Sequence, residues 1–260
     1  MFGHRGAAGV APENTLPSFA LAAALGADYL ELDVHATADG EIVVLHDPLL
    51  ERTTNGSGPV AAHSWAQVAG LDAGYHFTHD GHTFPYRGQG VRVPTLAAVL
   101  REFPRSCMNI EIKAGDAAVV DAVLALLRRA ASLERVLLAA ERDDLMGTIR
   151  ATAAEQVATG MSFGDIVDFI GRLQRGEWTG YAAPGRALQV PPAHDGIELV
   201  SAASIAAAHR VGLEVHVWTI NDAAEIARLL DLGVDGVMSD LPGLAAAAVA
   251  ERRSAGGATR

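Results

Sequence analysis

Tyr29-Leu30-Glu31-Leu32-Asp33-Val34 alternates apolar side chains with polar ones, which is typical of a β-strand with two different faces. Glu31 and Asp33 therefore point to one face, roughly 7 Å apart along the strand. Two carboxylates on one face repel each other unless a positive group lies between them, and a hard cation with oxygen ligands meets that need. The alternative is a solvated strand face whose acids are incidental, and the spacing alone leaves it open.

Strand-like apolar runs recur along the chain, and helical patterns separate most of them. The eight runs lie near Phe2 and at residues 29–34, 108–112, 135–139, 156–160, 187–190, 214–219 and 236–239. The helical patterns cover residues 15–25, 95–103, 116–131, 143–154, 201–211 and 222–232. Alternating strands and helices predict parallel pairing, and eight such units in 260 residues favour a closed (β/α)8 barrel, the TIM barrel. The Gly-rich first turn of an open doubly wound sheet is missing. We therefore expect one α/β domain over residues 1–260.

The segment of residues 48–93 interrupts this rhythm. It has no clear helical pattern but is rich in Gly, His, Tyr and Phe, as in residues 74–82 and 84–88. An insertion of this length is usually functional or disordered, and its aromatic residues favour an ordered structure. We expect a small insertion after the second strand that forms a cap over the mouth of the barrel.

Composition and charge argue against several kinds of function. Hydrophobic residues make up 50% of the chain, which is enough for one barrel-sized core. The formal net charge of -11 argues against a nonspecific nucleic-acid or anionic-membrane surface. No apolar run has membrane-spanning length, and the start Met1-Phe2-Gly3-His4 leaves no room for a secretion signal, so no stable membrane anchoring is expected. The single cysteine, Cys107, cannot form an internal disulfide, which is compatible with a cytoplasmic location. The oligomeric state is left open.

Chemically versatile side chains gather where the predicted strands end. They are His4, Glu31, Asp33, Glu111, Lys113, Trp218 and Asp240, and His46-Asp47 lies shortly after the second strand. In (β/α)8 barrels, catalytic groups come from the carboxyl ends of the strands. Three acids without a Cys-His cluster make an oxygen-rich site, so the expected cofactor is a divalent cation, Mg²⁺ or Ca²⁺. Lys113 is the only lysine of the chain, and its compact charge suits a phosphoryl oxygen, although chance survival of one codon is the alternative.

Segments along nearly the whole chain resemble the glycerophosphodiester phosphodiesterase family, in its cytoplasmic bacterial type. These segments are His4-Arg5-Gly6 and residues 11–15, 31–34, 44–47, 93–96, 111–113, 217–221 and 235–242. The resemblance implies a (β/α)8 barrel with a small insertion after the second strand. It also implies a metal-dependent enzyme that hydrolyses glycerophosphodiesters to an alcohol and sn-glycerol 3-phosphate.

The same resemblance implies a role for each of seven residues. His4 and His46 would be the catalytic acid and base, Arg5 and Lys113 would bind the phosphate, and Glu31, Asp33 and Glu111 would hold the metal. Trp218 could form an apolar wall for the glycerol, with simple barrel packing as the alternative. Which histidine is the acid stays open. So does the first nucleophile, which is either a neighbouring glycerol hydroxyl or water.

Two other functions compete with this interpretation. A lysophospholipase D on the same barrel would cleave lysolipids, and an apolar groove under the cap would favour it. A non-catalytic barrel that binds phosphodiesters is less favoured, because a binding protein has no use for an acid/base pair.

Overall fold

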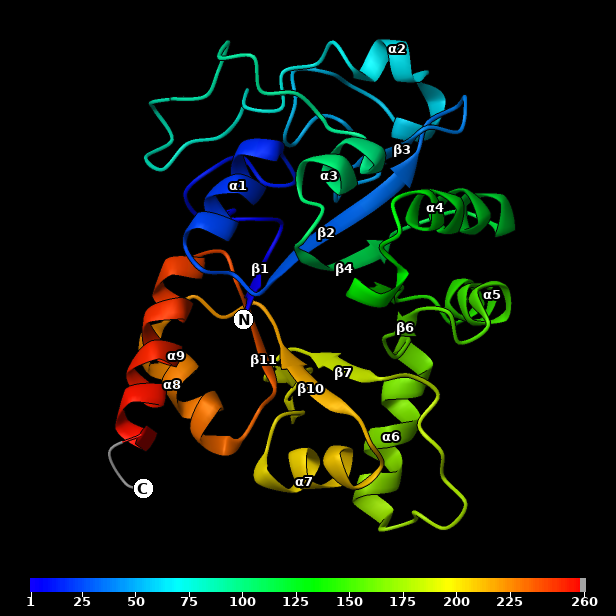
Figure 1. Cartoon of the computed structure of the whole chain (residues 1–260), viewed down its shortest axis with the longest axis vertical. Helices are drawn as coiled ribbons and strands as arrows, with labels where there is room; N and C mark the ends of the chain where they lie inside the picture. Colours follow the sequence, from blue (N-terminus) through cyan, green and yellow to red (C-terminus); the bar gives the residue numbers. More distant parts are fainter. Residues whose placement is uncertain (258–260) are drawn as a thin grey trace.

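Eight parallel strands form the centre of the computed structural model, which describes residues 1–257 and the side chains of residues 1–252. The strands pair in the order β6-β5-β4-β2-β1-β11-β10-β7, and a parallel bridge between Gly160 and Ala187 joins the two ends. The sheet is therefore the nearly closed barrel that the sequence predicts (Figure 1). Its strands are β1 (Phe2–Gly3), β2 (Tyr29–Ala36), β4 (Cys107–Ile112), β5 (Val136–Ala139), β6 (Ala158–Thr159), β7 (Ala187–Val190), β10 (Glu214–Val217) and β11 (Gly236–Ser239).

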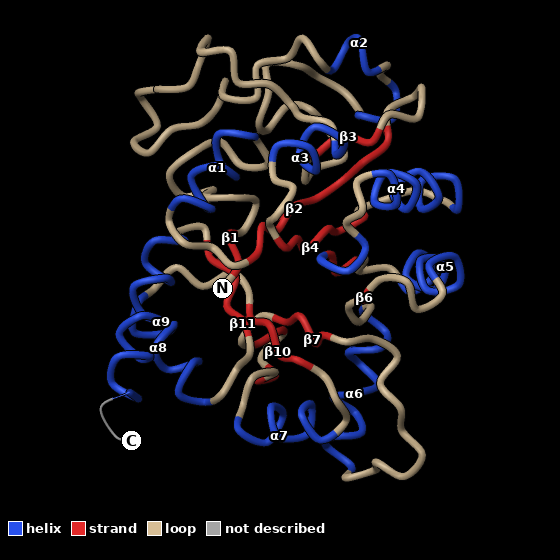
Figure 2. The backbone as a smooth tube through the Cα atoms, in the orientation of Figure 1, coloured by secondary structure: helices blue, strands red, loops and turns tan. Residues whose placement is uncertain are grey.

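Helices surround the barrel, as the blue segments outside the red strands show in Figure 2. Six of them lie at the predicted positions, and side chains such as Thr15, Thr95 and Asp116 cap their amino ends, each cap being worth about 1 kcal/mol. The six are α1 (Leu16–Ala24), α3 (Leu96–Glu102), α4 (Ala117–Arg129), α5 (Asp143–Ala153), α7 (Ala202–Arg210) and α8 (Ala223–Leu232). The sequence did not predict α6 (Phe163–Arg175), α9 (Pro242–Gly257) or the single 3-10 turn η2 (Leu133–Arg135).

The alternation in β2 decides what faces the barrel and what faces the helices. Leu30, Leu32 and Val34 are at most 1% exposed and belong to a core that includes side chains of α1, α3 and α4. Each such side chain contributes about 1.5–3 kcal/mol by leaving water. Because side chains alternate along a strand, Glu31 and Asp33 face the barrel interior. A second core, built from β7, β10, β11 and the helices that cover them, completes the other half of the barrel.

The insertion after β2 has a small hydrophobic core of its own. It begins beyond β3 (Ile42–Val44), which pairs antiparallel with β2, and contains η1 (Val60–Ala62) and the short helix α2 (Trp65–Val68). Leu50, Val60 and Val68 are buried together there, and Trp65 packs against them. The sequence did not predict α2. Figure 1 shows the segment at the top of the molecule, above α1 and α3.

A separate two-stranded sheet lies between β7 and α7 in the chain. It is the antiparallel hairpin of β8 (Ala193–His194) and β9 (Ile197–Glu198).

None of the helices in residues 1–257 has both the length and the apolar character that a membrane crossing requires.

Candidate active site

Two neighbouring strands bring three acids together. β2 carries Glu31 and Asp33, and β4 carries Glu111 directly opposite Asp33 in the parallel register. One carboxylate oxygen from each residue lies within 4.8 Å of the other two. Glu31 and Asp33 are buried, and Glu111 is half-buried. The structure thus places the three acids that the sequence singled out in one oxygen-rich cluster.

Ionising all three acids of this carboxylate cluster costs free energy when no cation is bound to them. Burial and the neighbouring Asp33 raise the pKa of Glu31 from its ordinary 4.5 to about 8. Burial also raises the pKa of Glu111, against the opposing charge of Lys113. A divalent cation would remove this repulsion, and carboxylate oxygens are the ligands that Mg²⁺ and Ca²⁺ prefer. The three donors therefore fit a hard divalent cation.

Two basic side chains border the carboxylates. Lys113 Nζ donates to Glu111 Oε1 at 2.9 Å and lies 3.7 Å from Asp33 Oδ1. Arg5 Nε lies 3.5 Å from Asp33 Oδ2, and the Arg5 backbone N–H donates to Glu31 Oε2 at 2.8 Å. Burial lowers the pKa of both basic groups, but the surrounding carboxylates outweigh it and raise the pKa, so both stay charged. A guanidinium and an ammonium beside an oxygen-rich cluster are suited to a phosphate group.

A tight turn after β1 holds Arg5 in this place. Arg5 and Gly6 have left-handed backbones, with φ of 49° and 88°. A Cβ at Gly6 would lie 2.7 Å from the Ser18 carbonyl carbon, so only glycine fits there. Asn14 donates its backbone N–H to the Arg5 carbonyl at 2.9 Å and its Nδ2 to Asp33 Oδ2, also at 2.9 Å. The loop after β1 is thereby tied to the acid on β2.

His4 belongs to a hydrogen-bonded chain at the end of β11. Its Nδ1 lies 2.6 Å from Asp240 Oδ1, and Asp240 Oδ2 accepts from Asn221 Nδ2 at 2.7 Å. Burial lowers the pKa of His4, but the hydrogen bond to Asp240 and the charge of Glu31 outweigh it, and the pKa is raised. Since Nδ1 is engaged by the carboxylate, Nε2 is the ring atom left for proton transfer. The sequence placed Asp240 at a strand end but gave it no role.

His46 has a similar carboxylate partner, supplied by the next residue. Its Nδ1 lies 2.7 Å from Asp47 Oδ1. Its carbonyl contacts His35 Nε2 at 3.0 Å, and the Leu45 N–H donates to the Asp33 carbonyl at 3.0 Å. These contacts fasten the segment that carries His46 to β2, beside the acids.

Trp218 lies at the carboxyl end of β10, and 41% of its surface is exposed. The structure joins Glu31, Asp33, Glu111, Arg5 and Lys113 through direct contacts. His4, His46 and Trp218 come from other strand ends, and among the described residues no hydrogen bond joins their side chains to that group.

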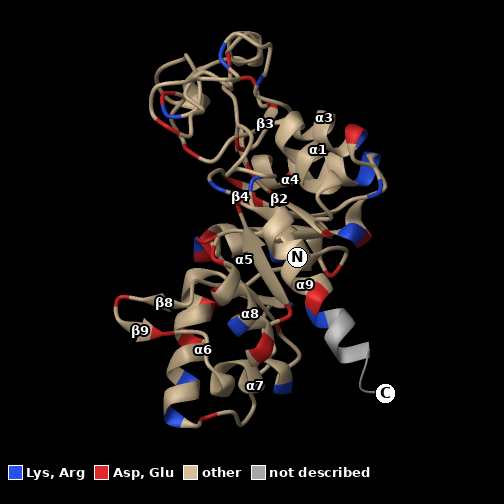
Figure 3. Ribbon diagram, turned by 90° about the vertical axis from the view of Figure 1, so that its left-hand side faces the viewer, with Lys and Arg blue, Asp and Glu red and all other residues tan. Residues whose placement is uncertain are grey.

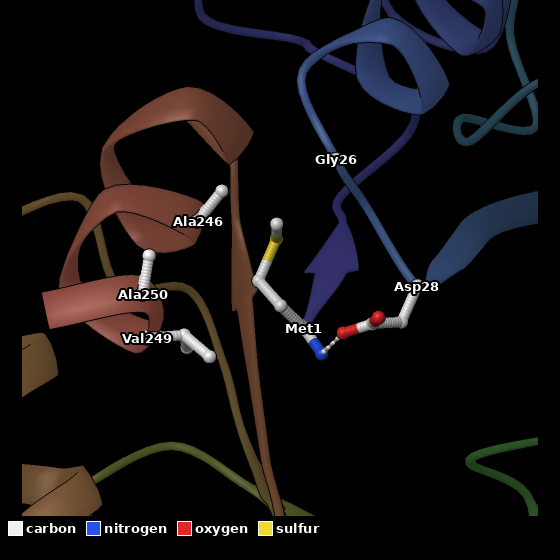
Figure 4. Close-up of a pocket in the computed structure, with 6 residues that line it drawn as sticks. All are labelled: Met1, Gly26, Asp28, Ala246, Val249 and Ala250. Atoms are coloured by element: carbon white, nitrogen blue, oxygen red, sulfur yellow. Dashed lines mark hydrogen bonds and ion pairs between the residues drawn. The ribbon is translucent and has the colours of Figure 1, made fainter. Parts of the chain in front are cut away.

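A surface pocket of about 250 Å³ lies elsewhere, beside the amino-terminal residue (Figure 4). Its charged groups are the Met1 amino group and Asp28, which pair with each other at 2.7 Å. Its other lining residues are Gly26, Ala246, Val249 and Ala250. It contains none of the acids or histidines described above and adds no group to their chemistry.

The barrel and the groups at its strand ends define the class of protein, an enzyme that hydrolyses phosphodiesters. Residues 4–244 match the model of the glycerophosphoryl diester phosphodiesterase family, and the chain belongs to that family.

Relatives of this family cover nearly the whole chain. It is 30% identical to a glycerophosphodiester phosphodiesterase of Bacillus subtilis, over 93% of this chain and 83% of the relative. It is 26% identical to the human lysophospholipase D GDPD1, over 92% and 82%. An Oleispira antarctica phosphodiesterase, solved in complex with the product sn-glycerol-3-phosphate, superposes with a TM-score of 0.77 at 26% identity and covers 96% of both chains.

Proposed function

We propose that this enzyme hydrolyses glycerophosphodiesters to an alcohol and sn-glycerol 3-phosphate by a metal-dependent, two-histidine mechanism. One observation carries the proposal, namely the contact of Arg5 and Lys113 with the carboxylate cluster of Glu31, Asp33 and Glu111. A phosphodiester is anionic, so a nucleophile approaches its phosphorus only when nearby positive groups offset that charge. When bound, a divalent cation held by the three acids would supply Lewis-acid stabilisation of the phosphoryl oxygens.

Arg5 and Lys113 hold the phosphate by its free oxygens in this mechanism. One histidine removes a proton from the attacking hydroxyl, which belongs to the glycerol or to water, and the other gives a proton to the departing alkoxide. If the glycerol hydroxyl attacks, the product of this step is a cyclic phosphate, which water then opens to sn-glycerol 3-phosphate. The Asp240 and Asp47 contacts support these roles because each fixes a ring nitrogen and leaves Nε2 of His4 or His46 for the proton. Near neutral pH, histidine suits both tasks.

Further parts of the proposal concern the surroundings of the site. The segment of residues 48–93 forms a cap over the barrel mouth, within one domain of residues 1–260. Trp218 forms an apolar wall for the glycerol. We also propose a cytoplasmic location, in keeping with a single cysteine, and a small-molecule substrate without nucleic-acid partners.

Exposed apolar side chains at the barrel mouth favour lysolipids as a second substrate class. Leu49, Phe163, Ile197 and Trp218 are between 41% and 54% exposed, and they lie in the segments that connect β2 to β4, β6 to β7, β7 to β10 and β10 to β11. Figure 3 shows the β8–β9 hairpin, which carries Ile197, and the insertion projecting toward the same side. Large apolar groups exposed around a polar site are suited to the hydrocarbon chain of an amphiphilic substrate.

The test is release of glycerol 3-phosphate by the purified enzyme from glycerophosphocholine, compared with lysophosphatidylcholine. Each substrate is assayed with Mg²⁺, with Ca²⁺ and with EDTA. Metal-dependent release of glycerol 3-phosphate supports the proposal, and release that persists in EDTA contradicts the role of the metal. Lysophosphatidic acid formed from the lysolipid alone would assign the enzyme to the lysophospholipases D.

A further inference from the structure

An arginine of the insertion joins two sides of the active site. Arg52 Nε donates to Asp47 Oδ2 at 2.6 Å, and Arg52 Nη2 donates to Asp47 Oδ1 at 3.0 Å. The same guanidinium donates to Glu13, from Nη1 to Oε2 and from Nη2 to Oε1, both at 2.7 Å. The planar guanidinium thus makes four hydrogen bonds to two carboxylates, whereas an ammonium has only three N–H donors.

Each of these carboxylates in turn contacts a group of the proposed mechanism. Asp47 Oδ1, which accepts from Arg52, is also the partner of His46 Nδ1 at 2.7 Å. Glu13 Oε1 accepts from Arg5 Nη1 at 2.9 Å. A single carboxylate, that of Asp47, therefore lies between Arg52 and the imidazole of His46. Another, that of Glu13, lies between Arg52 and Arg5, which borders the carboxylate cluster.

The backbone around Arg52 is firmly held. Leu50 and Thr54, two residues to either side, are 0% exposed. Thr54 donates its backbone N–H and its hydroxyl to the Leu50 carbonyl, at 3.1 Å and 2.7 Å, which closes a turn around Arg52. The backbone from which the Arg52 side chain extends is therefore held in place.

The two histidines differ in the group that donates a hydrogen bond to their carboxylate partner. The neutral amide of Asn221 donates to Asp240, whereas the cationic Arg52 donates to Asp47. Hydrogen bonding to Arg52 holds the pKa of Asp47 well below its usual range. A carboxylate that already neutralises a guanidinium stabilises an imidazolium less strongly than one that does not.

We propose that Arg52 is a positioning residue, which orients His46 through Asp47 and Arg5 through Glu13. The inference rests on the proposed roles of His46 and Arg5. His35 on β2 and Glu111 on β4 also face His46, and the substitutions below leave both in place.

The experiment compares Arg52→Met and Arg52→Lys with the parent enzyme on glycerophosphocholine at saturating metal. Arg228→Met is the matched control. Arg228 is 47% exposed against 45% for Arg52, and it makes an equally short two-bond contact with Glu225 on the far helix α8. Thermal melting of every variant reports whether the fold is retained.

We expect Arg52→Met to lower kcat by about tenfold to a hundredfold, the range caused by misplaced reacting groups. One limb of its pH profile should move upward, because the variant removes a cation that donates to Asp47. Arg52→Lys should restore the pH limb but not the full kcat, and Arg228→Met should match the parent.

Parental kcat and an unmoved pH profile in Arg52→Met would overturn the inference. A loss of activity that parallels a loss of thermal stability, with both limbs of the pH profile unmoved, would also overturn the inference. That pattern is expected of a residue with a purely structural role. The variant His46→Ala distinguishes a failure of the proposed role of His46 from a failure of the proposed role of Arg52. If that variant keeps parental activity, the proposed role of His46 fails, whereas an inactive His46→Ala beside a normal Arg52→Met contradicts the role of Arg52 alone.

Discussion

Replacing Glu31 with glutamine should stabilise the metal-free protein above neutral pH, although it removes a proposed metal ligand. Burial and the charge of Asp33 raise the pKa of Glu31 from 4.5 to about 8. A carboxyl group with a raised pKa in the folded state supports folding fully below its unfolded pKa. That support is lost as the pH rises to the folded pKa. At 1.36 kcal/mol per pH unit, the loss amounts to about 4 kcal/mol at pH 8.

The amide of Glu31→Gln keeps an oxygen for the Arg5 backbone N–H but carries no charge. Chemical denaturation in EDTA should therefore show the variant to be about 2–4 kcal/mol more stable than the parent at pH 8.5, with little difference near pH 4.5. Saturating Mg²⁺ or Ca²⁺ should narrow this difference, because the parent has all three carboxylates and gains more binding energy, about 2.7 kcal/mol at a hundredfold excess over its Kd.

Glu13→Gln is the matched control, since it changes a second, half-buried glutamate of the same site. Burial opposes ionisation of Glu13, but Arg52 and Arg5 outweigh it and lower the pKa of this carboxyl. Its contribution to stability is present above the unfolded pKa and is lost as the pH falls, so Glu13→Gln should destabilise the protein at pH 8.5. If Glu31→Gln is the less stable protein at pH 8.5 in EDTA, or if both variants shift stability in one direction, the electrostatic reasoning is refuted.

Three further predictions concern turnover. His4→Ala and His46→Ala should each lower kcat by about 10²–10⁴-fold while circular dichroism and Tm stay near parental values, and parental turnover in either variant would contradict its assignment. Glu111→Gln should raise the metal concentration needed for half-maximal activity at least tenfold, and superimposable metal titrations would remove Glu111 from the ligand set. Trp218→Ala should raise KM for lysophosphatidylcholine more than KM for glycerophosphocholine, and equal effects would speak against an apolar contact with the lipid chain.

The barrel could be predicted because its strands carry a local pattern. In β2, one face packs on helices and the other faces the barrel, so the residues of each face recur every second position. Helix α6 was missed although its signal was present. Ser162 and Asp165 form a capping box, and Phe163, Ile166, Phe169 and Ile170 recur at helical spacing. Helix α9 contains a run of alanines without a clear apolar stripe, so its periodicity carries little information.

The carboxylate cluster was predictable only in part. Local alternation gives the common face of Glu31 and Asp33, but the position of Glu111 opposite Asp33 depends on the register between β2 and β4. The partners Glu13 and Arg52 are 39 residues apart, and Asn221 and Asp240 come from the ends of different strands. No periodicity encodes such contacts, because they form only once the barrel has brought its loops to one end.

The residues that hold the reacting groups in place answer an electrostatic problem. Three carboxylates in a half-buried cluster destabilise the metal-free fold, yet the same density of oxygen atoms is what gives a cation its affinity. Arg5 and Lys113 offset part of that charge, but they must keep some of their donors for a phosphate. Glu13 and Arg52 pair with each other and add no net charge, but they restrain Arg5 without displacing it from the cluster. A sequence motif can indicate the groups that react, whereas the groups that hold them depend on the folded geometry.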